Sequence, residues 1–253
     1  MENFYDKVAR KYGGYAFGAH KPKYFSEHPS GDPEKIFKDK LLELAGGDKI
    51  ALDVGCGDCK FAFGIADRFR EIVGIDTSKE LLNIAEAKKE ALKVANVSFL
   101  LQDAENTTFK DESLDIIYCR RGPSFLKEYY RLLRKGASYL EIGIGEKDAI
   151  ELKRIFGRGQ DFGKWDKSRL SEDVAELKKL GFEVNFSEEF NYSEYYPSHK
   201  DLEVFLQRVP IFEDFDPEKD REYLETYCKD FQTEKGIVLH RHRIVLVARK
   251  SVK

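Results

Sequence analysis

The sequence predicts an α/β fold: a doubly wound, mostly parallel seven-stranded sheet with a reversed final strand and helical cap insertions. Three observations predict it. Short apolar segments alternate along the chain with segments of helical periodicity. The first of these apolar segments, at 50–54, runs directly into a glycine turn at 55–57. Acidic residues then follow the next two apolar segments, at Asp76 and Asp103.

The individual elements follow from local signals. Asp32 and Pro33 have the residue types of an N-cap and a first helical position, and the helix that they open ends near Gly46. Thr77 begins the capping-box pattern Thr-Ser-Lys-Glu, which opens a second long helix. Further helices are expected at 60–69, 124–133 and 171–180, and strands at 50–54, 72–75, 97–101, 114–119, 137–144, from 182 onward and at 236–248.

The chain length of 253 residues fits one large α/β domain. Two segments, 146–169 and 193–235, exceed ordinary α/β connections, so we expect insertions that cover the site. We therefore expect a single domain over 1–253, with an N-terminal cap segment at 1–47, a ligand-binding half at 48–145 and a substrate-side half at 146–253.

Composition narrows the class of protein. With 42% hydrophobic residues and a mean hydropathy of -0.54, the chain has enough apolar content for a core and is otherwise polar. The net charge of -3 gives no global positive field toward nucleic acid. No apolar run approaches a membrane span, and the charged segment 1–14 differs from a secretory signal. These observations predict a cytoplasmic protein without a membrane partner.

The cysteines do not predict a metal centre. Four cysteines in a chain of this length fit a reducing compartment. Cys56 and Cys59 have CxxC spacing, but Cys119 and Cys228 are isolated and no histidine pair completes a zinc ligand set. We expect no metal here.

The strand ends predict the ligand. Ligands of open α/β sheets lie beyond the carboxyl ends of the strands, where Asp76 can accept both hydroxyls of a ribose and Asp103 the amine of adenine. A dinucleotide site would need a third glycine where this chain has Lys60, and no phosphate-binding GxxxxGK[ST] motif is present. The pattern favours adenosine without pyrophosphate.

At these residues the sequence resembles the class I S-adenosylmethionine-dependent methyltransferases, and is similar to the quinone-biosynthesis type. The resemblance covers about 48–145 and consists of five stretches in register: Ala51 to Gly57, Val73 to Ser78, Gln102 to Ala104, Phe109 to Ile117 and Arg131 to Gly136. The chain departs from the family at Cys59, where a third small residue, often glycine, is usual. Cysteine is small enough for that position.

The resemblance implies S-adenosylmethionine as the cofactor. It implies that the cofactor contacts the first glycine loop, the two strand-end acids with their following residues, and the end of the fourth strand. The residues at these positions are Asp53, Gly55, Cys56, Gly57, Asp76, Thr77, Asp103, Ala104 and Arg120.

The sequence says least about the methyl acceptor. Methyl transfer from a sulfonium needs mainly in-line positioning, so no fixed catalytic motif is expected and the catalytic residue is unknown at this point. Tyr15, His20 and Arg121 are the candidate acceptor-binding residues. Arg120 to Pro123 replaces the element that many amino-base methyltransferases carry after this strand, which argues against a base amine as acceptor.

Three functions follow from this pattern. A small-molecule methyltransferase is favoured. An RNA methyltransferase that uses the basic residues around 154–169 is the second, although Asp161 and Asp166 dilute this cluster and a solvated flexible loop is the favoured explanation for it. A non-enzymatic cofactor-binding protein is the third. His240 and His242 are possible bases, but the alternation His240-Arg241-His242-Arg243 fits one face of a surface strand, so a structural role is favoured for both.

Overall fold

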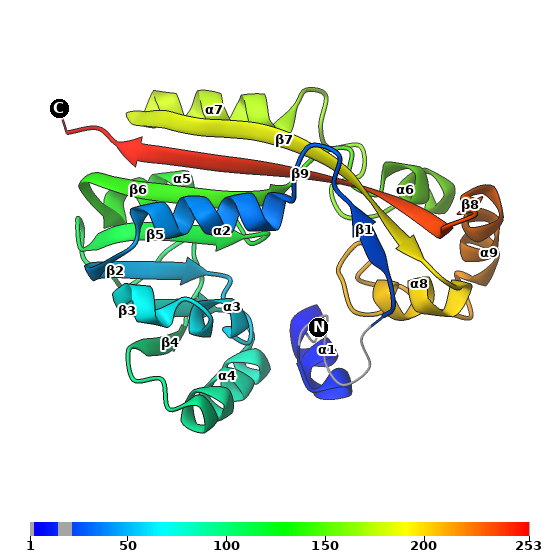
Figure 1. Cartoon of the computed structure of the whole chain (residues 1–253), viewed down its shortest axis with the longest axis horizontal. Coiled ribbons are helices and arrows are strands. Elements are labelled where there is room, and N and C mark those ends of the chain that lie inside the picture. The colour runs from blue at the N-terminus through cyan, green and yellow to red at the C-terminus, as the bar shows by residue number, and fades with distance from the viewer. Residues whose placement is uncertain (1–2, 15–21, 253) are drawn as a thin grey trace. The chain divides into compact units, whose positions relative to one another are not determined.

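The computed structural model describes residues 3–14 and 22–252. Within them the strands form one sheet in the order β1-β7-β9-β6-β5-β2-β3-β4, and β8 pairs with β9 (Figure 1). The strands are β1 (Phe25–Glu27), β2 (Gly46–Val54), β3 (Phe69–Asp76), β4 (Val97–Leu101), β5 (Leu114–Arg120), β6 (Leu133–Ile144), β7 (Phe182–Tyr196), β8 (Gln232–Thr233) and β9 (Gly236–Lys250). The helices are α1 (Phe4–Tyr12), α2 (Pro33–Leu44), α3 (Lys60–Phe63), α4 (Lys79–Leu92), α5 (Leu126–Leu132), α6 (Ile150–Phe156), α7 (Arg169–Leu180), α8 (His199–Leu206) and α9 (Arg221–Asp230).

The predicted fold class is confirmed. Neighbouring strands from β4 through β3, β2 and β5 to β6 are all parallel. The arrow of β9 points against that of β2 in Figure 1, which is the expected reversal of the final strand. The described residues contain nine strands instead of seven, because β1 and β8 were not expected. These strands have three and two residues, too few to show an alternating apolar pattern.

The chain divides into two compact units, which are described separately. The first unit comprises Met1–Gly31, Ile144–Arg169 and Phe190–Arg243, and the second comprises Asp32–Gly143, Leu170–Glu189 and Ile244–Lys253.

In the second unit, helices cover both faces of the parallel strands. Tyr118 of β5 contacts the Phe61 ring of α3, and Phe61 in turn contacts Phe37 of α2. Tyr139 of β6 lies beside Ile117 and contacts Tyr129 of α5. Because successive residues of a strand point to opposite faces, α2 and α3 lie over one face and α5 over the other. Residues at the strand ends are thereby held by a core on both sides.

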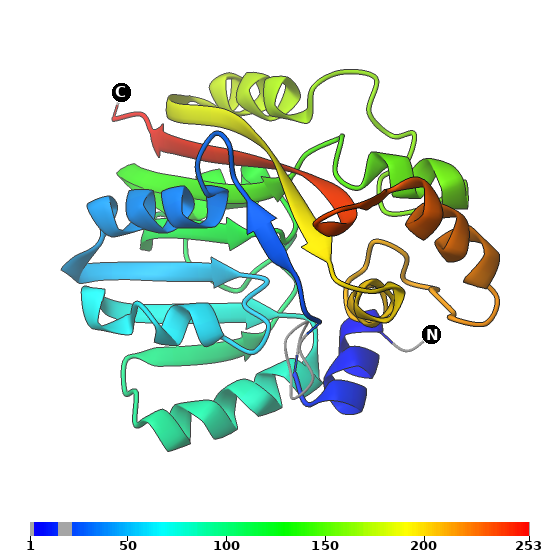
Figure 2. The ribbon, with the colours of Figure 1, turned by 45° about the vertical axis from the view of Figure 1, so that its right-hand side comes forward.

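The first unit has a core of its own. Buried apolar side chains of α6, α8, α9 and the ends of β7 and β9 form one cluster, which includes Phe156, Leu202, Tyr227 and Leu239. Strand β1 pairs antiparallel with β7. Helix α1, blue in Figures 1 and 2, lies beside α8, and both line one groove. The two long insertions are therefore largely folded segments of this unit.

Two local predictions need correction. The helix expected at 60–69 is the short α3 followed by a 3₁₀ turn, Ala66–Arg68, because Gly64 ends α3 after one turn. The N-cap of α4 is Ser78 and not Thr77, since the Ser78 hydroxyl accepts the backbone N–H of Leu81 at 3.2 Å. The N-cap at Asp32 is confirmed, with a side chain that accepts from Glu34 N–H at 2.9 Å.

Candidate functional site

The predicted cofactor residues lie at the carboxyl ends of four adjacent parallel strands. Strand β2 pairs with β3 on one side and β5 on the other, and β3 pairs with β4. The glycine turn follows β2, and Asp76 and Arg120 are the last residues of β3 and β5. Asp103 follows β4 by two residues. One edge of the sheet thus carries every predicted cofactor residue.

The turn after β2 needs glycine for its backbone conformation. Gly55 and Gly57 have φ angles of 66° and 56°, in the left-handed region that residues with a Cβ rarely adopt. The backbone N–H groups of Gly55 and Cys56 both donate to the Ile75 carbonyl, at 2.9 and 3.1 Å. Cys59 also has a positive φ, 53°, and directly precedes α3. At Gly55 and Gly57 the turn therefore presents backbone without side chains at the ends of β2 and β3.

Asp76 is fixed by backbone donors. The Gly57 N–H donates to its Oδ2 at 2.8 Å, and the Ser78 N–H donates to its Oδ1 at 2.8 Å. The carboxylate is therefore oriented by the turn and by the start of α4. Thr77 lies exposed between them.

The end of β4 carries an exposed acid. The Asp103 side chain accepts the Glu105 N–H at 2.9 Å, while the residue itself is solvent-exposed and the following Ala104 is buried. The Gln102 N–H donates to the Asp76 carbonyl at 3.1 Å. This bond ties the segment after β4 to the end of β3, so Asp103 belongs to the same edge as Asp76.

Asp53 is the buried acid of the site. It lies opposite Tyr118 in the pairing of β2 with β5, and only 3% of its surface is exposed. Burial raises the pKa of Asp53 to about 7, although the positive charge of Arg120 and the hydroxyl of Tyr118 lower it. Near neutral pH the Asp53 carboxyl is therefore close to half-ionised. A charged ligand bound beside it can shift its protonation.

Two arginines at the end of β5 share one carboxylate. Nη2 of Arg120 donates to Glu34 of α2 at 2.8 Å, and Nη1 of Arg121 contacts the other oxygen of the same carboxylate. The Arg120 guanidinium also lies 4.1 Å from the centre of the Phe61 ring. Arg121 has a φ of 59°, a conformation in which a side chain is strained. Sequence reasoning missed Glu34, whose only signal was an acid in the first turn of a helix.

The two cysteines of the turn are thiols. Both are free, and they lie against Gly74 of β3, where a Cβ would come within 2.7 Å of the Cys56 sulfur. A hydrogen bond with Cys59, together with burial, raises the pKa of Cys56 well above its usual value. A metal ligand must be a thiolate, so these conditions disfavour metal binding at this pair.

The structure describes only one of the three candidate acceptor residues. Tyr15 and His20 lie outside the described residues. Arg121 lies beside Arg120 at the strand ends, as described above.

Of the basic residues around 154–169, Arg158 donates to both oxygens of Asp220 at 2.9 Å, and Arg169 donates to the Ile144 carbonyl at 2.6 Å. These two side chains therefore already have partners within the first unit.

Residues 241–243 are buried, contrary to the expected surface strand. Arg241 and Arg243 both donate to Asp148, at 2.9 and 2.6 Å, and Arg241 also donates to Glu194 at 2.8 Å. Burial would raise the pKa of Asp148, but the two guanidinium groups hold it well below its usual range. The expectation failed because arginine is seldom buried unless acids from distant segments pair with it.

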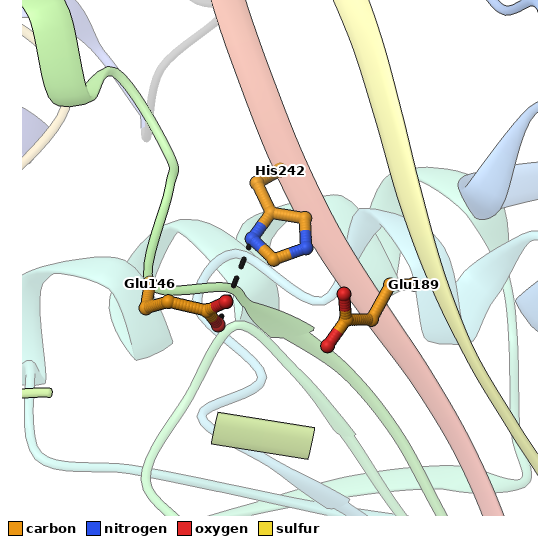
Figure 3. Close-up of side chains that lie close together, drawn as sticks. All are labelled: Glu146, Glu189 and His242. Atoms are coloured by element: carbon orange, nitrogen blue, oxygen red, sulfur yellow. Dashed lines mark ion pairs between the residues drawn. The ribbon is translucent and has the colours of Figure 1, made fainter. Parts of the chain in front are cut away.

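His242 has a structural environment. Figure 3 shows its imidazole facing the Glu146 carboxylate, with Nδ1 and the oxygen 3.8 Å apart. Nδ1 also accepts the Lys147 backbone N–H at 3.2 Å, which occupies its lone pair. The Arg169 N–H donates to Glu146 at 3.3 Å. Glu189, also drawn in Figure 3, belongs to the second unit. The contacts of His242 and Glu146 stabilise the turn after β6.

Comparison with known proteins shows which family part of the chain resembles. Residues 51–141 match the sequence model of a family described as a methyltransferase domain. This part of the chain is therefore similar to that family. The chain is 31% identical over 116 residues to the uncharacterized methyltransferase YcgJ of Bacillus subtilis (strain 168), an alignment that covers 43% of this chain and 46% of that protein. It is 28% identical over 127 residues to the demethylmenaquinone methyltransferase of Geobacillus sp. (strain WCH70), covering 46% of this chain and 54% of that protein. The chain thus spans about half the length of the curated relatives it matches.

Solved structures support the methyltransferase fold. A protein of Bacillus halodurans C-125 has a TM-score of 0.65 at 23% identity, covering 86% of this chain and 99% of that one. The structure of YcgJ has a TM-score of 0.63 at 17% identity, over 86% and 99%. A SAM-dependent methyltransferase of Methanosarcina mazei has a TM-score of 0.53 at 16% identity, over 85% and 98%. Among residues 3–14 and 22–252, no helix has the length and apolar character needed to cross a membrane.

Proposed function

We propose that this chain is an S-adenosylmethionine-dependent methyltransferase that acts on a small-molecule acceptor. The observation that carries the proposal is Asp76, a strand-end carboxylate held by two backbone N–H groups beside a glycine turn. A carboxylate fixed in this way can accept the two hydroxyls of a ribose, while the bare backbone of the turn lets a ligand approach.

The residues fit the adenosine part of the cofactor. We assign the ribose to Asp76, with Thr77 beside it, and the adenine amine to Asp103, with the buried Ala104 behind it. Lys60 replaces the third glycine of a dinucleotide loop, which agrees with a ligand that carries no pyrophosphate.

The residues also fit the methionine part. When bound, S-adenosylmethionine supplies a methyl group on a positively charged sulfur that is an excellent leaving group. We assign the amino group to Asp53, whose ionised form a cation would favour, and the carboxylate to Arg120. Glu34 and Phe61 hold Arg120 in place for this role.

On the acceptor side, the chain needs mainly to position a nucleophile and exclude water. We assign this task to Tyr15, His20 and Arg121. Residues of the insertions at 146–169 and 193–235 contribute to the core of the first unit. A base is needed only for an acceptor that enters protonated, so the catalytic residue stays unassigned.

A small molecule is favoured over RNA. One matched relative is a demethylmenaquinone methyltransferase, whose name gives a small-molecule substrate. In addition, Arg158 and Arg169, two of the basic residues on which the RNA alternative depended, are bound by Asp220 and a backbone carbonyl. A net charge of -3 supplies no general attraction to a polyanion.

Calorimetry tests the cofactor assignment. We expect S-adenosylmethionine and its demethylated product to bind, and Asp76→Ala to weaken both by about 1–3 kcal/mol, because a charge-assisted pair of hydrogen bonds is lost. Asp67→Ala is the matched control, since Asp67 is exposed in the 3₁₀ turn before β3. Absence of binding by the wild-type chain would overturn the proposal.

Transfer of a labelled methyl group separates an enzyme from a binding protein. A panel of phenolic, quinol and carboxylate acceptors, with RNA as the comparison, should yield a labelled small molecule. Label in RNA alone would replace the small-molecule assignment, and cofactor binding without any transfer would favour a non-enzymatic role.

A further inference from the structure

Strand β4 is an edge strand of the sheet. It pairs with β3 on one side, and no strand among residues 3–14 and 22–252 pairs with its other side (Figure 1). Proteins usually block such an edge with a charge, a proline or a bulge. The five residues of β4 are Val, Ser, Phe, Leu and Leu, and their register with β3 is regular. The edge of β4 is therefore suited to pairing with a further strand.

The hydrogen bonds to β3 determine which backbone groups of β4 point to this open side. The Asn96 carbonyl accepts the Ile72 N–H at 2.9 Å, and the Gln102 N–H donates to the Asp76 carbonyl at 3.1 Å. In a parallel pair, every second residue of a strand bonds to the same neighbour. Residues with even numbers therefore bond to β3. The N–H and C=O groups of the intervening residues point away from β3, and these residues are Val97, Phe99 and Leu101.

Apolar side chains of this edge are exposed. Leu100 and Leu101 are 40% and 57% exposed, although both belong to a strand. On the face that carries Leu101, Val97 is buried, and the Phe99 ring contacts the Phe63 ring of α3 at 5.9 Å between centroids. The edge thus combines outward-facing backbone groups with exposed apolar side chains, which are the features that promote pairing with another strand.

We propose that β4 pairs antiparallel with β4 of a second copy of this chain, about a twofold axis at Phe99. A strand edge is complementary to itself in this arrangement, because each donor of one copy meets an acceptor of the other. With Phe99 opposite Phe99, Val97 lies opposite Leu101 of the second copy. All outward N–H and C=O groups of the three residues are then used, in about six hydrogen bonds. The exposed Leu101 packs beside Val97 of the second copy.

The charges that flank β4 favour the antiparallel direction. Lys93 precedes the strand, Glu105 follows it, and both are exposed. The two residues are equally distant from Phe99 along the chain. With the axis at Phe99, Lys93 of each copy therefore approaches Glu105 of the other. Parallel pairing of the same strands would instead bring Lys93 beside Lys93, which is unfavourable.

Sedimentation equilibrium of the full chain over a range of concentrations tests the pairing. We expect a reversible monomer–dimer equilibrium with a Kd in the micromolar range, because a five-residue edge makes a small interface. Leu101→Lys places a charge within the pairing and should weaken the dimer by about tenfold or more. Val252→Lys is the matched control, since Val252 is an exposed apolar residue of the same unit outside β4, and it should leave association unchanged.

Two results of this experiment would overturn the proposal. One is a wild-type chain that stays monomeric at every concentration. The other is a Leu101→Lys variant that is folded by circular dichroism and associates as the wild type does.

Exchange of the flanking charges tests the direction of pairing, and it decides the question if Leu101→Lys does not fold. Lys93→Glu and Glu105→Lys should each weaken the dimer about threefold, because like charges then meet at both ends of the paired strands. The double variant restores opposite charges and should recover the association of the wild type. A double variant that associates no better than the single variants would contradict the antiparallel arrangement.

Amide hydrogen exchange measures the expected hydrogen bonds directly. At concentrations that favour the dimer, the amides of Val97, Phe99 and Leu101 should exchange about tenfold more slowly than in dilute solution. The amides of Ser98 and Leu100 point toward β3, so their exchange rates should be the same in both samples. Equal rates for the first three amides at the two concentrations would refute pairing through β4.

Discussion

The protonation of Asp53 makes the stability of this chain depend on pH in a defined interval. Burial raises the pKa of Asp53 from 3.8 to about 7, against the opposing influence of Arg120 and Tyr118. The other titratable groups that interact with it are Asp76, Cys56 and Cys59. The unfolded chain therefore releases this proton near pH 4, whereas the folded chain retains it until about pH 7.

The sign follows from proton linkage. Between pH 4 and 7 the folded state binds one proton more than the unfolded state at this position, so the free energy of unfolding falls as the pH rises and then levels off. At 1.36 kcal/mol per pKa unit, the rise from 3.8 to about 7 corresponds to about 4 kcal/mol in full. About 3 kcal/mol of that change falls between pH 5 and pH 8.

Asp53→Asn removes the charge and keeps the shape of the side chain. Urea unfolding of both proteins at pH 5 and pH 8 should show the variant gaining about 3 kcal/mol relative to the wild type between the two pH values. Asp67→Asn, an exposed change, should show no such gain. A difference between wild type and Asp53→Asn that is the same at both pH values would refute the assignment of a half-ionised carboxyl.

Two further changes test the neighbourhood of this acid. Glu34→Gln removes an anion that pairs with Arg120, so the positive charge of Arg120 acts more strongly on Asp53. The pH-dependent fall in stability should therefore shift to lower pH. Glu43→Gln, at the exposed end of the same helix, should leave the pH profile unchanged. Gly74→Ala would place a Cβ within 2.7 Å of the Cys56 sulfur and should cost about 1–3 kcal/mol in urea unfolding, whereas Gly47→Ala, with open space around it, should cost far less. An unshifted profile for Glu34→Gln, or equal costs for the two alanine variants, would contradict these contacts.

The geometry of the strand ends was predictable because its signals are local. The turn at 55–57 needs glycine for positive φ angles, and Asp76 accepts N–H groups from Gly57 and from Ser78, its near neighbour. The carboxyl ends of parallel strands lie at the same edge of the sheet. Short motifs that follow neighbouring strands therefore come together there. The errors in this half are local: the N-cap of α4 is Ser78 in place of Thr77, and the helix expected at 60–69 ends at Phe63.

Contacts between distant segments were not predictable. Arg120 meets Glu34 across 86 positions of the chain, and Arg241 meets Asp148 across 93. An isolated arginine is normally a surface residue, so residues 241–243 were expected on a surface strand and are buried instead. Only the folded arrangement identifies an arginine that is paired in the interior.

The division between predictable and unpredictable residues follows the chemistry of methyl transfer. The family match ends at residue 141, and it covers the strand ends that the proposed cofactor needs. Transfer from a sulfonium makes few demands on the acceptor side beyond position, so that side can differ between relatives without loss of the reaction. Residues 146–169 and 193–235 lie outside the matched residues and belong to a unit with its own core. Patterns shared with relatives therefore predict the strand ends and leave the first unit undetermined.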